Sequence, residues 1–235
     1  MKTEMDDIRI FLDTTQKTGL HPELGWKRLP MQEEEVARIL ETTGIDYVIS
    51  DYQCPYFPIY RYDDLEAVNK VAEIVDTLHD QERLILKAWC DRHEATATDL
   101  GEIGSAALQI SKIEYLPGVK DSKALGRYLA IETDLGKRIQ AIVEEKTGVT
   151  ENCFDYDKLG RSYQDICDGY YVYSLDSEKE IQGYVISDSE VDRSLYSTQE
   201  LKKLEIGSQK DPILECMDRT AGRHPFAFGD RKIER

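Results

Sequence analysis

Apolar and polar positions alternate near the start of the chain and then change to a helical period. Residues 8–13, IRIFLD, carry apolar side chains at every second position, which is typical of a strand. Turn-forming residues follow, and we expect a loop over residues 20–30. The next stretch, MQEEEVARILETTG, predicts a helix with glutamates in its first turn and Gly44 as its stop. Residues 1–44 are therefore predicted to form a small α+β module.

A second strand and two amphipathic helices are predicted in the middle of the chain. Residues 45–52, IDYVISDY, are rich in β-formers, and DDLEAVNKVAEIVDTLH then has a helical period with Asp63 or Asp64 as N-cap. QERLILKAWCDRH predicts a further helix, which completes a module over residues 45–120. The buried stripe of the first helix is predicted to be Leu65, Val68, Val71, Ala72, Val75 and Leu78.

Short helices dominate the third predicted module, residues 121–174. DSKALGRYLAIET and GKRIQAIVEEKTG have helical periods, and Gly148 is placed to end the second helix. DYDKLGRSYQDI predicts a helix capped by Asp155, and GYYVYSL predicts the strand after it. Residues 175–235 differ from the three modules in sequence pattern and are taken as an extension of unknown role. The fold class is thus α+β, as a chain of small modules.

The net charge adds a strongly acidic surface to this picture. Thirty Lys and Arg against 46 Asp and Glu give −16, although 40% hydrophobic residues still provide for a core. Between residues 46 and 102, thirteen acids and five bases give −8. Such a chain repels nucleic acid and anionic membranes, so its partner should be basic. We expect one exposed acidic helix face, with Lys70 as its only nearby base, formed by Glu66, Glu73, Asp76, Asp80 and Glu82.

The motifs that the sequence lacks indicate the protein's compartment and the redox state of its cysteines. The start of the chain has no apolar signal region, and no run reaches the roughly 18 apolar residues of a membrane span, so we expect a cytoplasmic protein. The five cysteines are widely spaced without a C-x-x-C, which suggests neither a disulfide framework nor a zinc site. We expect reduced, mostly half-buried thiols.

Catalytic motifs are weak. DYD at residues 155–157 fits a loose metal-binding D-x-D pattern, but side chains two apart on a helix point in different directions. CMDRTAGR at residues 216–223 is like a cysteine phosphatase loop with one residue too many. The four histidines are scattered, and no carboxylate pair is singled out as general acid and base. No catalytic residue, metal or cofactor is predicted.

Two separated stretches together resemble the ArdA family of antirestriction proteins. Residues 46–78 are similar to its middle domain, and ALGRYLAIETDLG with FDYDKLGRSYQDI resembles its C-terminal domain, although Ser162 stands where the family usually has Asp. LGWKRLPMQEEEV is a weaker N-terminal likeness, so the resemblance covers roughly residues 8–174. The matching positions are Gly25, Trp26, Leu29, Pro30, Asp51, Tyr52, Pro55, Phe57, Asn69, Phe154, Asp155, Tyr156, Gly160 and Arg161.

The resemblance implies a function without catalysis. Such a protein, typical of conjugative and other mobile genetic elements, would mimic duplex DNA in charge and shape and occupy the DNA groove of a type I restriction-modification enzyme, at its methyltransferase core. It also implies an elongated homodimer joined through the C-terminal module, where we place Phe154, Tyr156 and Leu159 in the interface. The acidic surface would comprise Asp51, Asp63, Asp64, Glu66, Glu73, Asp76, Asp80, Glu82, Glu132, Asp134, Glu144, Glu145, Asp155, Asp157, Asp165 and Asp168.

Two other classes of function stay open on sequence alone. An acidic adaptor of a mobile element would use the same faces against a basic protein that is not a nuclease. An enzyme would keep one cleft with two carboxylates of perturbed pKa. Convergent buried acids in a cavity would favour the enzyme.

Overall fold

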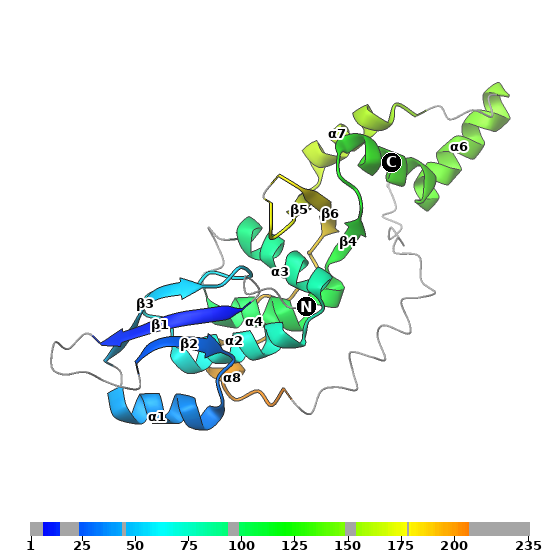
Figure 1. Cartoon of the computed structure of the whole chain (residues 1–235). Coiled ribbons are helices and arrows are strands. Elements are labelled where there is room, and N and C mark those ends of the chain that lie inside the picture. The colour runs from blue at the N-terminus through cyan, green and yellow to red at the C-terminus, as the bar shows by residue number, and fades with distance from the viewer. Residues whose placement is uncertain are drawn as a thin grey trace. The chain divides into compact units, whose positions relative to one another are not determined.

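The computed structural model describes residues 7–14, 24–43, 46–93, 99–148, 154–177 and 179–206. They form two three-stranded sheets with helices, which confirms the α+β class (Figure 1). By its internal contacts the chain divides into two units. The first contains the residues up to Ile113 together with Val172–Glu180 and Asp188–Ile206, and the second contains Glu114–Tyr171 and Ile181–Ser187. Each is described by itself.

The sheet of the first unit is antiparallel, with strand order β2-β1-β3. Its strands are β1 (Ile8–Thr14), β2 (Gly25–Leu29) and β3 (Tyr47–Gln53). The prediction of a loop over residues 20–30 was wrong for β2, which pairs with β1 along its whole length. Trp26 is the one strong β-former in this strand of Gly, Trp, Lys, Arg and Leu, so pairing decides its conformation.

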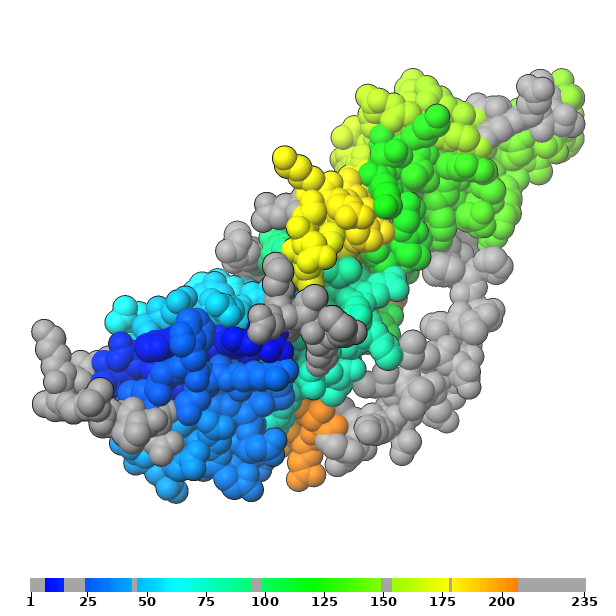
Figure 2. Space-filling model, in the orientation of Figure 1, coloured from blue at the N-terminus to red at the C-terminus, as the bar shows by residue number. Residues whose placement is uncertain are grey.

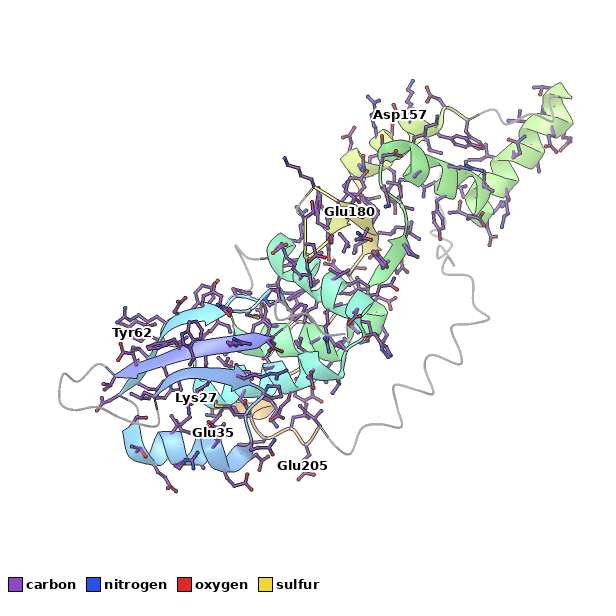
Figure 3. The ribbon with its side chains drawn as sticks, in the orientation of Figure 1. Lys27, Glu35, Tyr62, Asp157, Glu180 and Glu205 are labelled. Atoms are coloured by element: carbon purple, nitrogen blue, oxygen red, sulfur yellow. The ribbon has the colours of Figure 1, made fainter. Side chains whose placement is uncertain are left out.

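Helices of the first unit bury more surface than their stripes predict. They are α1 (Glu33–Thr43), α2 (Leu65–Thr77), α3 (Asp80–His93), α4 (Leu100–Leu108), the 3₁₀ turn η2 (Ile110–Lys112) and α8 (Thr198–Leu201). In α2 the predicted stripe is buried except for half-buried Leu78, and Ala67 and Ile74 are buried as well. Ion pairing adds to packing, because Lys27 of β2 lies 3.0 Å from Glu35 of α1 (Figure 3).

The second sheet has strand order β4-β6-β5. It consists of β4 (Glu114–Pro117), β5 (Tyr170–Tyr173) and β6 (Ile181–Ser187). The central strand β6 comes from the region that the sequence left without a role. It repeats the letters YVIS of β3, and both copies are strands.

Helices α5 (Ser122–Ile131), α6 (Asp134–Thr147) and α7 (Tyr156–Ile166) complete the second unit. Its core contains Leu125 of α5 together with Tyr184 and Ile186 of β6. α5 and α7 touch backbone to backbone, since a Cβ on Gly126 would overlap the carbonyl of Tyr156. Gly160 is equally close to the carbonyl of Ser122, so only glycine fits at both positions.

Candidate acidic interaction surface

The sixteen predicted surface acids all lie in described segments, and none is fully buried. Five are partly buried, and the rest are exposed in the single chain. The partly buried ones are Asp63, Asp64, Glu73, Glu82 and Asp157; the exposed ones are Asp51, Glu66, Asp76, Asp80, Glu132, Asp134, Glu144, Glu145, Asp155, Asp165 and Asp168. The predicted exposure of the α2–α3 face is thus wrong for Glu73 and Glu82.

Basic side chains from elsewhere reach this acidic helix face. Lys70 pairs with Glu73 at 2.7 Å, as its position on α2 suggests. Lys202, distant in sequence, pairs with Glu66 at 2.5 Å. Arg83 of α3 lies 3.8 Å from Asp76. Lys70 is therefore not the only nearby base, because tertiary contacts add two more cations.

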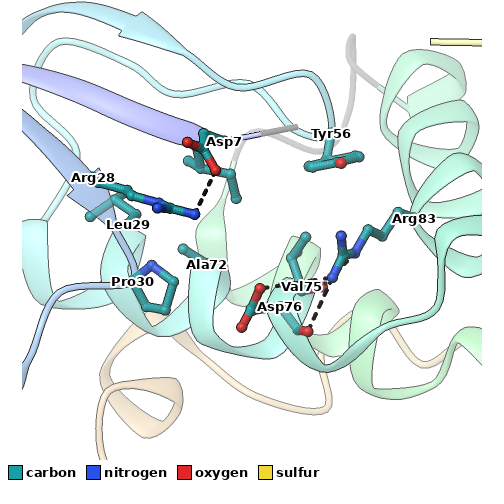
Figure 4. Close-up of a pocket in the computed structure, with 10 residues that line it drawn as sticks. Asp7, Arg28, Leu29, Pro30, Tyr56, Ala72, Val75, Asp76 and Arg83 are labelled. Atoms are coloured by element: carbon teal, nitrogen blue, oxygen red, sulfur yellow. Dashed lines mark hydrogen bonds and ion pairs between the residues drawn. The ribbon is translucent and has the colours of Figure 1, made fainter. Parts of the chain in front are cut away.

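Arg83 also binds the C-terminal end of helix α2 through its side chain. Its buried guanidinium donates hydrogen bonds of 3.1 Å to the carbonyls of Val75 and Asp76 (Figure 4). It lies over the ring of Tyr56, with 5.8 Å from Cζ to the ring centroid. Helix carbonyls at a C-terminus carry partial negative charge, so this arginine stabilises α2. It is a structural cation within the acidic surface.

Several acids cap helices. Asp64 accepts from the amide of Ala67 and caps α2, and Asp155 accepts from the amide of Lys158 and caps α7, as predicted. Asp99 caps α4 in the same way. A cap side chain satisfies an otherwise unpaired amide and is thereby fixed in direction. These carboxylates are therefore held in fixed positions by the backbone.

The N-cap cluster is the name we give to Asp63, Asp64, Glu66 and Asp99, at the starts of α2 and α4. Burial raises the pKa of Asp63, and the charges of Asp99 and Asp64 add to the shift. Lys202 bonds Asp64 at 2.8 Å. Burial lowers the pKa of Lys202, but its hydrogen bonds to Asp64 and Glu66 outweigh this and the pKa is raised. The ammonium is held charged among acids.

The D-x-D motif has a structural explanation. Asp155 caps α7, whereas Asp157 accepts from the hydroxyl of Ser122 at 2.5 Å and pairs with Arg161 (Figure 3). The hydrogen bond from Arg161 lowers the pKa of Asp157, and that from Ser122 adds to the effect. In the described ranges no group of three or more His, Cys, Asp or Glu side chains could hold a metal ion.

A small cavity in the first unit contains two acids, each beside an arginine. Asp7 pairs with Arg28 at 2.7 Å, and Asp76 lies beside Arg83 (Figure 4). The cavity has a volume of about 30 Å³, which holds roughly one water molecule and is too small for a substrate. Each of these acids lies beside an arginine and they do not converge on a free space, so this cavity gives the carboxylate-pair enzyme no support.

A larger cavity, of about 280 Å³, is lined by Tyr52, Phe57, Cys54 and Cys90 among others. Burial raises the pKa of Cys54 to about 11 and also raises that of Cys90. Thiols of this kind are poor nucleophiles at neutral pH. Cys54 and Cys167 are half-buried, as expected, while Cys90 is buried. Cys153, Cys216 and the phosphatase-like run lie outside the described residues.

The geometry of this acidic surface does not by itself identify the protein's family, but a comparison with known families does. The sequence model of a family described as "Antirestriction protein (ArdA)" matches residues 24–174. The chain belongs to the ArdA family. Comparison with curated proteins and with solved structures gives no match. ArdA is a non-enzymatic antirestriction family, and membership implies interaction with restriction-modification enzymes.

The ArdA match covers only part of the described structure. It includes β2, β3, β4, β5 and helices α1 to α7, but it ends before β6 and α8. Sequence reasoning missed the residues that lie outside the ArdA match and pair with acids inside it. Lys202 is the clearest case; its helix carries a signal, because Ser197 and Glu200 form a capping box.

The residues predicted for an ArdA dimer contact are partly buried in the single chain. Phe154, Tyr156 and Leu159 lie at the start of α7, which packs on α5. Larger apolar exposure occurs on α6, where Leu135 is 58% and Ile142 is 55% exposed. Among the helices described, none is long and apolar enough to cross a membrane.

Proposed function

We propose that this ArdA-family protein inhibits type I restriction-modification enzymes by DNA mimicry. It would occupy the DNA-binding groove of the methyltransferase core without catalysing a reaction. The observation that carries the proposal is the exposure of eleven of the sixteen predicted acids, spread over both units. A duplex presents about one charge per 1.7 Å, and its binding proteins meet that charge with Lys and Arg. Exposed carboxylates form ion pairs with the same lysine and arginine side chains.

Pre-organisation supports the proposal. A mimic must hold its charges in place, because each side chain ordered on binding costs roughly 0.5–1.5 kcal/mol. Asp155 is fixed by its cap hydrogen bond, and Asp157 by Ser122 and Arg161. Acids fixed during folding give up little further freedom when a basic partner binds.

We also propose a homodimer formed through the second unit. A dimer would carry 2 × −16 = −32 charges. The proposed contact is Phe154, Tyr156 and Leu159, and the exposed aliphatic stripe of α6 supports a wider one. Leu135, Ile139 and Ile142 follow a helical spacing on that stripe, and a row of exposed aliphatic side chains is typical of an interface.

The test is a titration of a purified type I methyltransferase core with amide variants, with duplex DNA as competitor. Neutralising one exposed acid, such as Asp165, should weaken binding by less than about five-fold, because a single solvated ion pair contributes about 1 kcal/mol or less. Neutralising four together should weaken it by about ten-fold or more. The block is Glu132→Gln, Asp134→Asn, Glu144→Gln and Glu145→Gln.

Salt and competition give two further readouts. Affinity should fall as salt concentration rises, since screening weakens exposed ion pairs. Duplex DNA should displace the protein from the core, which separates a mimic from an adaptor that binds elsewhere. A single amide substitution that abolishes inhibition in a folded protein would contradict a binding energy shared among many acids. It would favour an enzyme with one essential carboxylate.

A further inference from the structure

Residues 188–206, which we call the docked segment, pack on the first unit after strand β6. The segment contains helix α8, drawn in orange at the surface of that unit (Figure 2). It is attached at several points. Asp188 lies 2.7 Å from His93, Arg193 pairs with Glu102 at 2.7 Å, and the carbonyl of Asp192 accepts from Gln109 at 2.8 Å.

Helix α4 is shaped to receive this segment. A Cβ on Gly101 would lie 2.7 Å from the amide nitrogen of Thr198, and one on Gly104 would lie 2.7 Å from a methyl group of Leu201. Leu201 is fully buried, and Ser105 accepts from the amide of Tyr196. Such close packing fixes the segment, and with it the direction of the residue that follows Leu201.

That residue is Lys202, whose ammonium lies between two carboxylates of the N-cap cluster. It is 2.8 Å from Asp64 and 2.5 Å from Glu66. Thr198, four residues earlier, hydrogen-bonds Asp99 of the same cluster. Both acids that Lys202 contacts belong to the ArdA match, whereas the docked segment lies beyond it.

We propose that the docked segment is an internal competitor of the basic partner. Lys202 occupies Asp64 and Glu66 in the free protein, so a lysine or arginine of the partner must displace it before it can use these carboxylates. This inference rests on the proposed function, since it concerns the same acidic surface. By this competition the docked segment weakens binding of the partner at the N-cap cluster. The partner then relies on acids elsewhere on the surface.

The experiment compares two neighbouring lysines in the full-length protein. Lys202→Gln removes the internal ammonium, and Lys203→Gln removes the same charge from an exposed position outside the described ion pairs. Both variants have the same net charge, so an unspecific effect of charge is equal in the two. Binding to a purified type I methyltransferase core is titrated for each, and thermal unfolding verifies that α8 stays docked through Leu201.

The expected result is a tighter complex for Lys202→Gln than for Lys203→Gln, by about two- to five-fold, the range of one or two exposed ion pairs. A double-mutant cycle tests the mechanism. Glu66→Gln should weaken binding more in the Lys202→Gln background than in the native one, because only there is the carboxylate free for the partner.

Three outcomes overturn the inference in different ways. Equal affinities of the Lys202 and Lys203 variants, with additive effects of Glu66→Gln, would show that Lys202 does not compete, while binding itself leaves the proposed function intact. If neither the native chain nor any variant binds the core, the proposed function fails and the inference fails with it. Loss of α8 docking in Lys202→Gln together with unchanged affinity would also refute competition.

Discussion

Asn69 is one of the residues that carry the likeness to ArdA, and its contacts predict a structural role. It lies on α2 with 4% of its surface exposed. Its side-chain oxygen accepts from the amide of Met31 at 2.7 Å, and its nitrogen donates to the carbonyl of Met31 at 3.1 Å. Met31 connects β2 to α1 and is itself buried. The amide thus joins α2 to the β2–α1 connection.

Asn69→Ala should remove both hydrogen bonds to Met31, along with a third to Glu73 at 3.2 Å, and leave two buried backbone groups without their partner. Each bond contributes about 1 kcal/mol net, and an unsatisfied buried group costs about 1–3 kcal/mol. The free energy of unfolding should therefore fall by about 2–4 kcal/mol. For a protein of this size that corresponds to a melting temperature lower by about 5–15 °C.

Urea and thermal unfolding measure the change, with Gln81→Ala as the matched control. Gln81 is an exposed amide on α3, and its removal should change stability by less than about 0.5 kcal/mol. At a temperature where the Asn69 variant is folded, its inhibition of a restriction enzyme should equal that of the native protein. Unchanged stability, or lost inhibition in a fully folded variant, would refute the structural role.

Three further changes test the second unit. Ile139→Glu should shift a dimer towards monomer in sedimentation at tens of micromolar, whereas Ala141→Glu, with the same added charge, should not; equal behaviour contradicts an α6 contact. Asp157→Asn should destabilise the protein at pH 7, and the difference in unfolding free energy should shrink as pH falls from 5 to 2. The pKa of this carboxylate lies below its ordinary 3.8, so its stabilisation is present above that pH and lost as pH falls through the lowered pKa; a constant difference refutes this. Gly160→Ala should destabilise by about 3 kcal/mol or more, since its Cβ overlaps the carbonyl of Ser122, and an unchanged melting temperature would refute the close crossing.

The acidic character, the helices α1, α2, α3, α5, α6 and α7, and the caps of α2 and α7 were determined by the sequence itself, whereas α4 and α8 were not predicted. Apolar spacing predicted α2 and its buried stripe, and the Asp64 and Asp155 caps follow from local hydrogen bonding between a side chain and amides two or three residues ahead. The family resemblance was also carried by short local runs, and the family match confirmed it. These features depend on neighbours within one or two helical turns, so a linear pattern is sufficient to encode them.

Other features were decided by the tertiary structure. β2 is a strand because β1 pairs with it, and β6 enters the second sheet from a region with no assigned role. Lys202 reaches acids 136 and 138 positions away, since 202 − 66 = 136 and 202 − 64 = 138, and forms ion pairs with both carboxylates at the start of α2. No periodicity specifies such pairs, because their distance depends on the path of the whole chain. Sequence therefore determines how much charge the chain carries, and the fold determines which of these charges form ion pairs within the protein.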